Sequence, residues 1–159
     1  MGLDMYLSGK KYMSKYFDAE DTGRIAKVNE VFGVVGEEDG DYGAQEVTFR
    51  VAYWHKANAI HKWFVDKCQG GVDECQETYV DREQLKELSE TCKTVLADMS
   101  KAEELLPSES GFFFGSTDYD EWYFKDLEYT ATEIEKLLSI EKPEGRGYYP
   151  WSYVYHSSW

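Results

Sequence analysis

Polar and apolar residues alternate in several stretches of the first third of the chain, a pattern that is typical of half-buried strands. Residues 3–7 and 45–52 show this alternation and predict two strands, of which the second is the clearer. Residues 24–35 are rich in β-branched side chains, which favours one or two further strands, although their spacing also fits a helix. We therefore expect residues 1–52 to form mainly strands and loops.

From residue 53 onward the apolar positions recur every three or four residues, which predicts helices with one buried stripe each. One helix is expected over residues 53–68, and a second begins at Asp81, whose carboxylate suits a helix N-cap. A third is expected over about residues 118–141, so that residues 53–141 are mainly helical. The stripe expected to be buried in the third helix consists of Trp122, Leu127, Ala131, Ile134, Leu137 and Leu138.

Residues 148–159 return to an alternating pattern of aromatic and polar side chains and predict an edge strand. The chain has 159 residues, which suits one domain with a sizeable core, and its sequence shows no internal repeat. Together these features predict an α+β fold. Three main helices are expected to pack on a small antiparallel sheet, as a single domain over residues 1–159.

The chain is strongly acidic, with 31 Asp and Glu side chains against 17 Lys and Arg and a net charge of -14. An aromatic content of 16% argues for a packed fold rather than disorder despite that charge. Such a surface repels phosphate groups, which argues against direct nucleic-acid binding and favours a basic partner. The charge is uneven, because residues 1–67 carry 11 acidic and 9 basic side chains whereas residues 68–159 carry 20 and 8.

Acidic side chains are dense in the third expected helix and around its start, where the buried stripe leaves them on one exposed face. One interpretation is a solvated face that keeps the protein in solution. The other is a surface that imitates the phosphates of nucleic acid, attracts a basic groove and gains contact area from neighbouring aromatic rings. On this second interpretation, the residues expected to bind the partner are Asp118, Tyr119, Asp120, Glu121, Tyr123, Asp126 and Glu128.

Catalytic and cofactor motifs are missing from the sequence. It contains no P-loop, no Rossmann glycine fingerprint and no nucleophile elbow, so we expect neither an enzyme nor a bound cofactor. The spacing of Cys68 and Cys75, and of His55 and His61, does not fit the usual zinc-ligand pairs, so no metal site is expected. An enzyme that uses His61 or Cys75 through tertiary contacts stays an open alternative.

The three cysteines are an odd number, and the first residues lack the basic and apolar regions of a secretory signal. Both features predict free thiols and a cytoplasmic location. No run approaches the roughly 18 apolar residues that a membrane span requires, so we expect no membrane association.

Aromatic side chains are concentrated in the C-terminal part of the chain and are too numerous to fit in one small core. The segment Gly111-Phe112-Phe113-Phe114-Gly115 predicts a buried loop or a short strand. Rings that stay at the surface indicate a protein interface or a pocket that stacks a nucleobase.

Four segments of the sequence occur together in a known group of proteins. They are Met1-Gly2-Leu3-Asp4-Met5-Tyr6-Leu7, Tyr53-Trp54-x-Lys56-Ala57-Asn58-x-Ile60-His61-x-Trp63-Phe64, Gly111-Phe112-Phe113-Phe114-Gly115-Ser116-Thr117 and Ser157-Ser158-Trp159. Through these segments the chain resembles a family of small acidic proteins from Gram-positive phages and mobile elements. Its length and acidity are also similar to those of staphylococcal anti-CRISPR proteins. None of the segments is a catalytic signature.

The resemblance implies a non-enzymatic inhibitor that binds the RNA-guided DNA endonuclease of the host's type II CRISPR system, with the HNH nuclease domain as the expected docking region. Such a nuclease presents a basic surface to its target strand, so an acidic, aromatic-flanked surface bound there would block cleavage. The alternative function is a phage counter-defence protein that binds or sequesters a nucleotide in an aromatic pocket.

Overall fold

The computed structural model describes residues 2–35, 43–140 and 149–159 of the chain. The expected end of the third helix at residue 141 and the expected start of the last strand at residue 148 lie outside these ranges. The elements along the chain are β1 (Asp4–Tyr12), α1 (Asp21–Phe32), β2 (Glu46–His55), α2 (Asn58–Cys68), β3 (Thr78–Val80), α3 (Arg82–Ala97), the 3-10 helix η1 (Met99–Lys101), α4 (Ala102–Leu105), α5 (Glu121–Leu138) and β4 (Ser152–Ser158).

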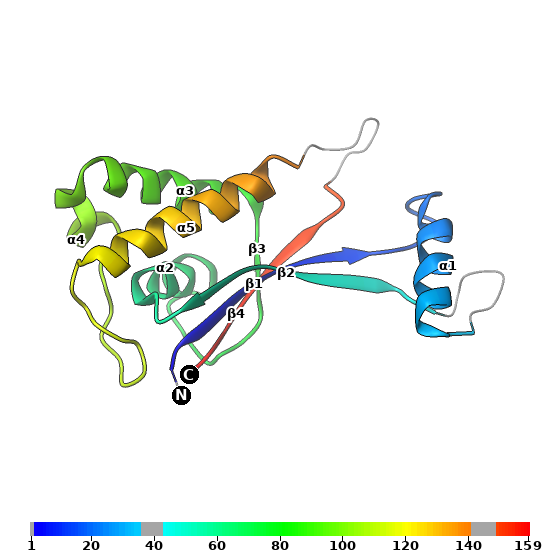
Figure 1. Cartoon of the computed structure of the whole chain (residues 1–159), viewed down its shortest axis with the longest axis horizontal. Coiled ribbons are helices and arrows are strands. Elements are labelled where there is room, and N and C mark those ends of the chain that lie inside the picture. The colour runs from blue at the N-terminus through cyan, green and yellow to red at the C-terminus, as the bar shows by residue number, and fades with distance from the viewer. Residues whose placement is uncertain (1, 36–42, 141–148) are drawn as a thin grey trace.

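The strands form one four-stranded antiparallel sheet in the order β2-β1-β4-β3. Side chains alternate along β1, so that Met5 and Leu7 are fully buried while the residues between them face the other side of the sheet. Helices α2, α3 and α5 lie together on the apolar side (Figure 1) and share one core with these strands. This architecture confirms the predicted α+β fold.

The strand predicted near the C-terminus is confirmed as β4, but it lies between β1 and β3, so its predicted place at the edge of the sheet is wrong. β4 pairs with β1 along its whole length, and Tyr153, Val154 and Tyr155 also pair with β3. These three residues are at most 4% exposed. The sequence did not indicate the true edge, because the three residues of β3 are too few to show a period of two.

Residues 24–35 do not form a strand, so the preferred interpretation of that segment is wrong. Most of them belong to α1, in which Ile25, Val28 and Phe32 follow the spacing of one helical face. Gly33 ends the helix in a left-handed conformation, with φ of 63°. Here the helical spacing outweighs the strand preference of β-branched side chains.

The helix expected from residue 53 begins five residues later, at Asn58. Tyr53 and Trp54 instead continue β2, in which Trp54 pairs with Met5 and is 2% exposed. Lys56 breaks the strand with a left-handed backbone, its φ being 60°. Trp54 stands at a spacing that suits either element, which is why the pattern alone misplaced the boundary.

α3 and α5 pack side by side over the sheet. α3 begins as predicted, because the Asp81 carboxylate accepts a hydrogen bond from the Gln84 N–H while the Gln84 side chain accepts one from the Asp81 N–H. In α5 the predicted stripe is buried at Leu127, Ala131, Ile134 and Leu137 and partly buried at Leu138.

Trp122 does not belong to the buried stripe of α5, and its prediction as a core residue is wrong. Its side chain is 71% exposed. Tyr123 stands four residues before Leu127 and therefore shares its face, whereas Trp122 is rotated roughly 100° further around the helix. Tyr123 fills the core position and Trp122 faces outward.

Beyond the helical layer, β1 and β2 continue as a two-stranded extension that carries α1 near its tip (Figure 1). We call residues 10–35 and 43–50 the arm. Among the twelve residues of α1, Ile25 is the one buried apolar side chain. The attachment of α1 therefore depends strongly on polar contacts.

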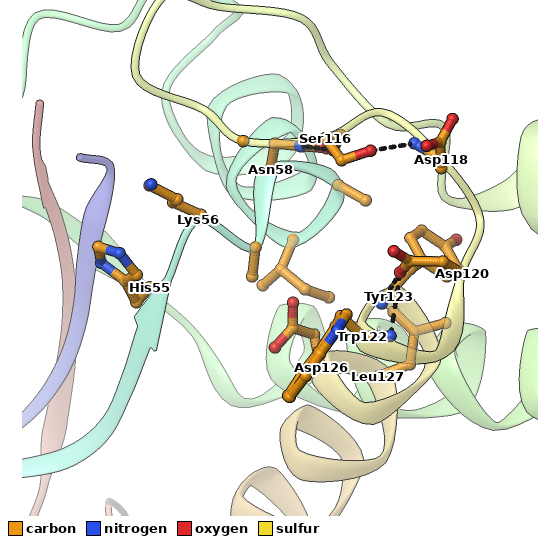
Figure 2. A pocket seen from close by; sticks show the side chains of 14 residues that line it. His55, Lys56, Asn58, Ser116, Asp118, Asp120, Trp122, Tyr123, Asp126 and Leu127 are labelled. Atoms are coloured by element: carbon orange, nitrogen blue, oxygen red, sulfur yellow. Dashed lines mark hydrogen bonds between the residues drawn. The ribbon is translucent and has the colours of Figure 1, made fainter.

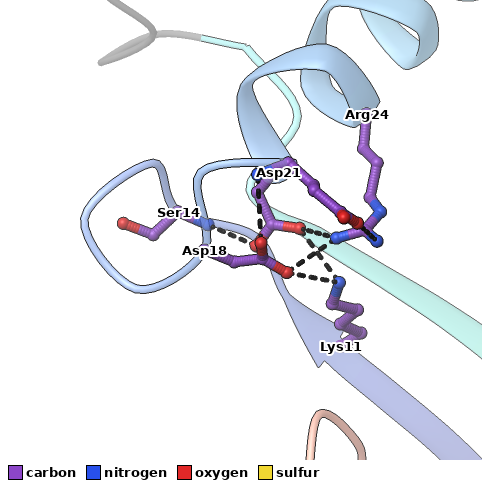
Figure 3. A network of polar contacts seen from close by, with 6 residues as sticks. Lys11, Ser14, Asp18, Asp21 and Arg24 are labelled. Atoms are coloured by element: carbon purple, nitrogen blue, oxygen red, sulfur yellow. Dashed lines mark hydrogen bonds and ion pairs between the residues drawn. The ribbon is translucent and has the colours of Figure 1, made fainter. Parts of the chain in front are cut away.

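Two buried carboxylates, those of Asp18 and Asp21, hold α1 against β1 within the arm (Figure 3). Lys11 Nζ lies 2.9 Å from Asp21 Oδ1, and Arg24 Nη1 lies 2.7 Å from Asp18 Oδ2 and from Asp21 Oδ1. Burial alone would raise the pKa of Asp21, but hydrogen bonds from Arg24 and Lys11 outweigh it and lower that pKa below its usual value. The two cations thus keep Asp21 charged, and both of them also pair with Asp18.

Lys11→Met should loosen α1 without unfolding the helical body, because it leaves Asp18 and Asp21 with one cation fewer. A hydrogen bond between charged groups is worth about 2 kcal/mol, so amide hydrogens of α1 should exchange about 30-fold faster. Hydrogen exchange read by mass spectrometry measures this change. Lys27→Met, at an exposed position on the same helix, should leave exchange unchanged. If the amide hydrogens of α1 exchanged at the same rate in the parent and in Lys11→Met, Lys11 would not be one of the contacts that hold α1.

Candidate protein-binding site

One buried side chain, the amide of Asn58 at the start of α2, ties the loop of residues 108–120 to the body. Its nitrogen donates hydrogen bonds to the carbonyls of Phe114 (3.1 Å) and Ser116 (2.7 Å), and its oxygen accepts one from the N–H of Glu109 (3.1 Å). Asn58 is 5% exposed, so these backbone groups would lose partners in a poorly hydrated place if the amide were removed. The loop is therefore held in one conformation.

Side-chain caps fix the end of this loop to α5 (Figure 2). The Asp120 carboxylate accepts hydrogen bonds from the N–H groups of Trp122 and Tyr123, both at 3.0 Å, and is the N-cap of the helix. The Ser116 hydroxyl accepts a hydrogen bond from the N–H of Asp118 at 3.0 Å. Asp120 thus has a structural role that explains its presence without any partner.

A cavity of about 300 Å³ lies between this loop, the first turns of α5 and the connection from β2 to α2. Ala57, Ile60 and Leu127 give it an apolar lining. The Asp126 carboxylate projects from α5 toward the middle of the cavity, and the Trp122 indole stands beside it (Figure 2). The cavity therefore combines a carboxylate with an exposed aromatic face.

The Asp126 carboxylate is in an unfavourable place for a charge. Burial, with a smaller contribution from the negative charge of Asp120, raises its pKa to about 6. Within the described ranges, no side chain donates a hydrogen bond to it or forms an ion pair with it. A carboxylate with a purely structural role normally has such partners, whereas functional sites often contain a carboxylate that has none. A cation entering the cavity would supply what Asp126 lacks.

The predicted partner-binding residues divide into two groups in the structure. Those at the surface are Asp118, Tyr119, Glu121 and Glu128, together with the capping residue Asp120. Asp126 is half-buried in the cavity, and the prediction of Tyr123 as a surface ring is wrong. Tyr123 is 8% exposed, and its hydroxyl donates a hydrogen bond to the Leu106 carbonyl at 2.7 Å.

Trp122 is the aromatic residue that the sequence analysis missed at this site. Taking Asp120 as the N-cap and counting back four residues from Leu127 would have placed Tyr123 inside and Trp122 outside. Lys125 already lies over the Trp122 ring, with Nζ 4.7 Å from the ring centroid. The indole thus already contacts one cation, while 71% of its side chain remains exposed.

Phe112 projects from the same loop and is 95% exposed, so the expectation of a wholly buried Phe segment is wrong. The Gly111 carbonyl accepts a hydrogen bond from the Phe114 N–H at 3.2 Å, so residues 111–114 form a tight turn with Phe112 near its tip. Glycine is needed at position 111, because a Cβ there would lie 2.6 Å from the Phe114 ring. Phe113 is held from below, since its carbonyl accepts a hydrogen bond from the N–H of Leu3 at 3.0 Å. The loop therefore displays a free phenyl ring on a fixed support.

A second cavity, of about 370 Å³, lies on the other side of this loop, and the three Phe residues and Trp159 line it. It is the place where the alternative nucleotide pocket would form. Asp73 and Glu109 also line it, and their negative charges would repel the phosphates of a nucleotide. The negative charge in this cavity therefore disfavours the nucleotide-binding alternative, whereas the acidic surface favours a basic protein partner.

His61, the first candidate for catalysis, is fully engaged inside the fold. Its Nδ1 lies 2.7 Å from the Tyr155 hydroxyl and its Nε2 lies 3.0 Å from Asp73 Oδ2. Burial lowers its pKa, against the opposing charge of Asp73, so the neutral ring is favoured. Through its two ring nitrogens, His61 links α2 to Tyr155 of β4 and to Asp73.

The three cysteines are free thiols. Burial raises the pKa of Cys68 and of Cys92 to about 12, so both are protonated and weakly nucleophilic at neutral pH. Among the described residues, no three His, Cys, Asp or Glu side chains gather closely enough to hold a metal ion. Across the same residues, no helix combines the length and apolar character needed to cross a bilayer.

Comparison of the chain with protein-family models, with curated proteins and with solved structures gives no match. The candidate site therefore rests on the geometry of the loop 108–120, the cavity and the first turns of α5.

Asp126→Asn should stabilise the protein at pH 8 and lose that effect in acid. The pKa of Asp126 is about 6 in the fold against about 4 in an unfolded chain, so its protonated form favours folding. That contribution is present below pH 4 and is lost as the pH rises through 6. The variant, which mimics the protonated acid, should melt above the parent at pH 8 and level with it near pH 4.

Thermal unfolding at a series of pH values measures this difference. Glu128→Asn, at an exposed position on the same helix, is the matched control and should show no such pH dependence. A gap between Asp126→Asn and the parent that does not change between pH 4 and pH 8 would contradict a strained carboxylate in the cavity.

Proposed function

We propose that the protein is an inhibitor that binds the RNA-guided DNA endonuclease of a type II CRISPR system and blocks target cleavage. The contact surface consists of the loop 108–120 and the first turns of α5. The observation that supports this proposal best is the unpaired Asp126 carboxylate in a cavity beside the exposed Trp122 ring. A basic side chain of the partner would pair with the Asp126 carboxylate and lie against the Trp122 ring.

Charge provides the long-range part of the recognition. Residues 68–159 carry 20 acidic and 8 basic side chains, and the exposed Asp118, Glu121 and Glu128 lie around the cavity's helix. A field of one sign attracts a basic surface and raises the association rate. The surface that a DNA nuclease offers to its target strand is basic, and the HNH domain is the expected docking region.

Aromatic contacts provide the short-range part. An arginine of the partner would stack on Trp122 and pair with Asp126, and Phe112 would add apolar contact area outside the cavity. The Asn58 amide holds the loop before binding, so little conformational entropy is lost on association. Inhibition would follow from covering the nuclease surface, with no chemical step on the inhibitor.

Charge reversal at the exposed acids of the site should weaken inhibition about tenfold or more, mainly by slowing association. Asp120 and Asp126 are left intact, because the first caps α5 and the second is half-buried. The site variant carries Asp118→Lys, Glu121→Lys and Glu128→Lys. The matched control carries Glu30→Lys, Glu83→Lys and Glu90→Lys, all at exposed positions.

Glu83 and Glu90 lie away from the site, because they line a hollow together with Leu138 near the other end of α5. Glu30 lies on α1 in the arm. Cleavage of a DNA target by the guide-loaded nuclease measures inhibition, and its salt dependence should fall with the site variant only. Inhibition by the site variant equal to that by the parent would remove this surface as the contact. The same would follow if both variants lost equal activity.

A further inference from the structure

The second cavity, the one of about 370 Å³ that the three Phe residues and Trp159 line, has aromatic walls. The rings of Phe114 and Trp159 meet edge to face, with centroids 6.1 Å apart, and those of His61 and Phe114 do so at 5.1 Å. The rings of Phe112 and Phe113 are also perpendicular, with centroids 4.8 Å apart. Neighbouring rings thus stand at steep angles to one another around a space of the size that a small ligand fills.

These walls are held in place without a ligand. The Phe114 carbonyl accepts a hydrogen bond from the Asn58 amide at 3.1 Å. The indole N–H of Trp159 donates one to Asp73 Oδ2 at 2.6 Å, which fixes a ring that is 50% exposed. A ligand that enters the cavity therefore spends little free energy on ordering its surroundings.

The charge at this cavity is negative. Among the described residues that line it, Asp73 and Glu109 carry carboxylates, His61 is neutral, and there is no Lys or Arg. Lys62 comes within 3.9 Å of Glu109, but it pairs more closely with Asp66, at 2.9 Å. The cavity thus favours a cation over an anion or a neutral molecule.

The Asp73 carboxylate supplies charge but has no acceptor left for a ligand. Its Oδ1 accepts hydrogen bonds from the Cys75 N–H (3.2 Å) and the Ser157 hydroxyl (3.3 Å). Its Oδ2 accepts those of the Trp159 indole and of His61 Nε2, at 2.6 and 3.0 Å. Burial alone would raise the pKa of Asp73, but these hydrogen bonds, led by that of Cys75, lower it and keep the group ionised. Four bonds fill the lone pairs of a carboxylate.

We propose that the second cavity binds a small organic cation that carries a trimethylammonium group. Such a group has no N–H and needs no acceptor, so the occupied oxygens of Asp73 cost it nothing. Its methyl groups pack against the rings, while its charge is attracted by the ring faces and by the two carboxylates. The cavity beside Asp126 differs, because the unpaired carboxylate there favours a cation that donates hydrogen bonds.

A titration with choline, followed by the amide NMR signals of the whole protein at constant ionic strength, tests this site. The signals of residues 112–114 and of the Trp159 indole should move and reach saturation. The matched probe is dimethylbutanol, the neutral isostere of choline in which carbon replaces nitrogen. It has the same shape without the charge and should bind about tenfold more weakly. The test contains no nuclease, so its outcome is independent of the proposed function.

Trp159→Leu removes one wall and should weaken choline binding about fivefold or more. Trp122→Leu, the matched control, removes an exposed ring that lines the other cavity and should bind choline as the parent does. Glu109→Gln keeps the backbone bond to Asn58 but removes a charge, and should weaken binding about threefold. It replaces Trp159→Leu if circular dichroism shows that the Trp159 variant is not folded.

Equal binding of choline and dimethylbutanol would overturn the proposal, because the cavity would then select apolar shape and not charge. Signals that stay in place at tens of millimolar choline would overturn it as well. So would choline binding that Trp122→Leu weakens and Trp159→Leu leaves unchanged, because the cation would then lie in the cavity beside Asp126.

Discussion

The buried amide of Asn58 is the contact on which the proposed binding surface depends. It bonds to three backbone groups of the loop 108–120, which is far away in sequence, and so fixes that loop against α2. The loop in turn forms one wall of the cavity that receives the Asp126 carboxylate, and it leads into the Asp120 cap of α5. Together with the hydrogen bond from the Leu3 N–H to the Phe113 carbonyl, this contact gives the cavity wall and the projecting Phe112 a defined position.

The molecule separates two kinds of surface. Acidic side chains and exposed rings gather where the loop meets α5, whereas exposed apolar side chains, among them Val31, Phe32 and Phe49, lie on the arm. Each surface has a destabilising feature that binding would relieve: a carboxylate with a raised pKa on the first and uncovered apolar groups on the second.

The sequence predicted features that depend on neighbouring residues. The Asp81 cap of α3 and the buried positions from Leu127 onward follow from local spacing and are confirmed. Features that depend on distant partners were not predictable in this way: the interior place of β4 requires β3, and the role of Asn58 requires a loop about 50 residues later. Trp122 was misplaced although local spacing could have placed it, because counting back four residues from Leu127 leads to Tyr123 and not to Trp122.

Hydrogen exchange of the protein, alone and bound to a guide-loaded type II nuclease, tests the central claim that the loop 108–120 and the start of α5 form the contact. Binding there should slow exchange of amide hydrogens within residues 109–128, while α3 and the arm keep their rates. Unchanged exchange at residues 109–128 in a formed complex would contradict the account. So would the failure of the two proteins to form a complex at low salt, where attraction between opposite charges is strongest.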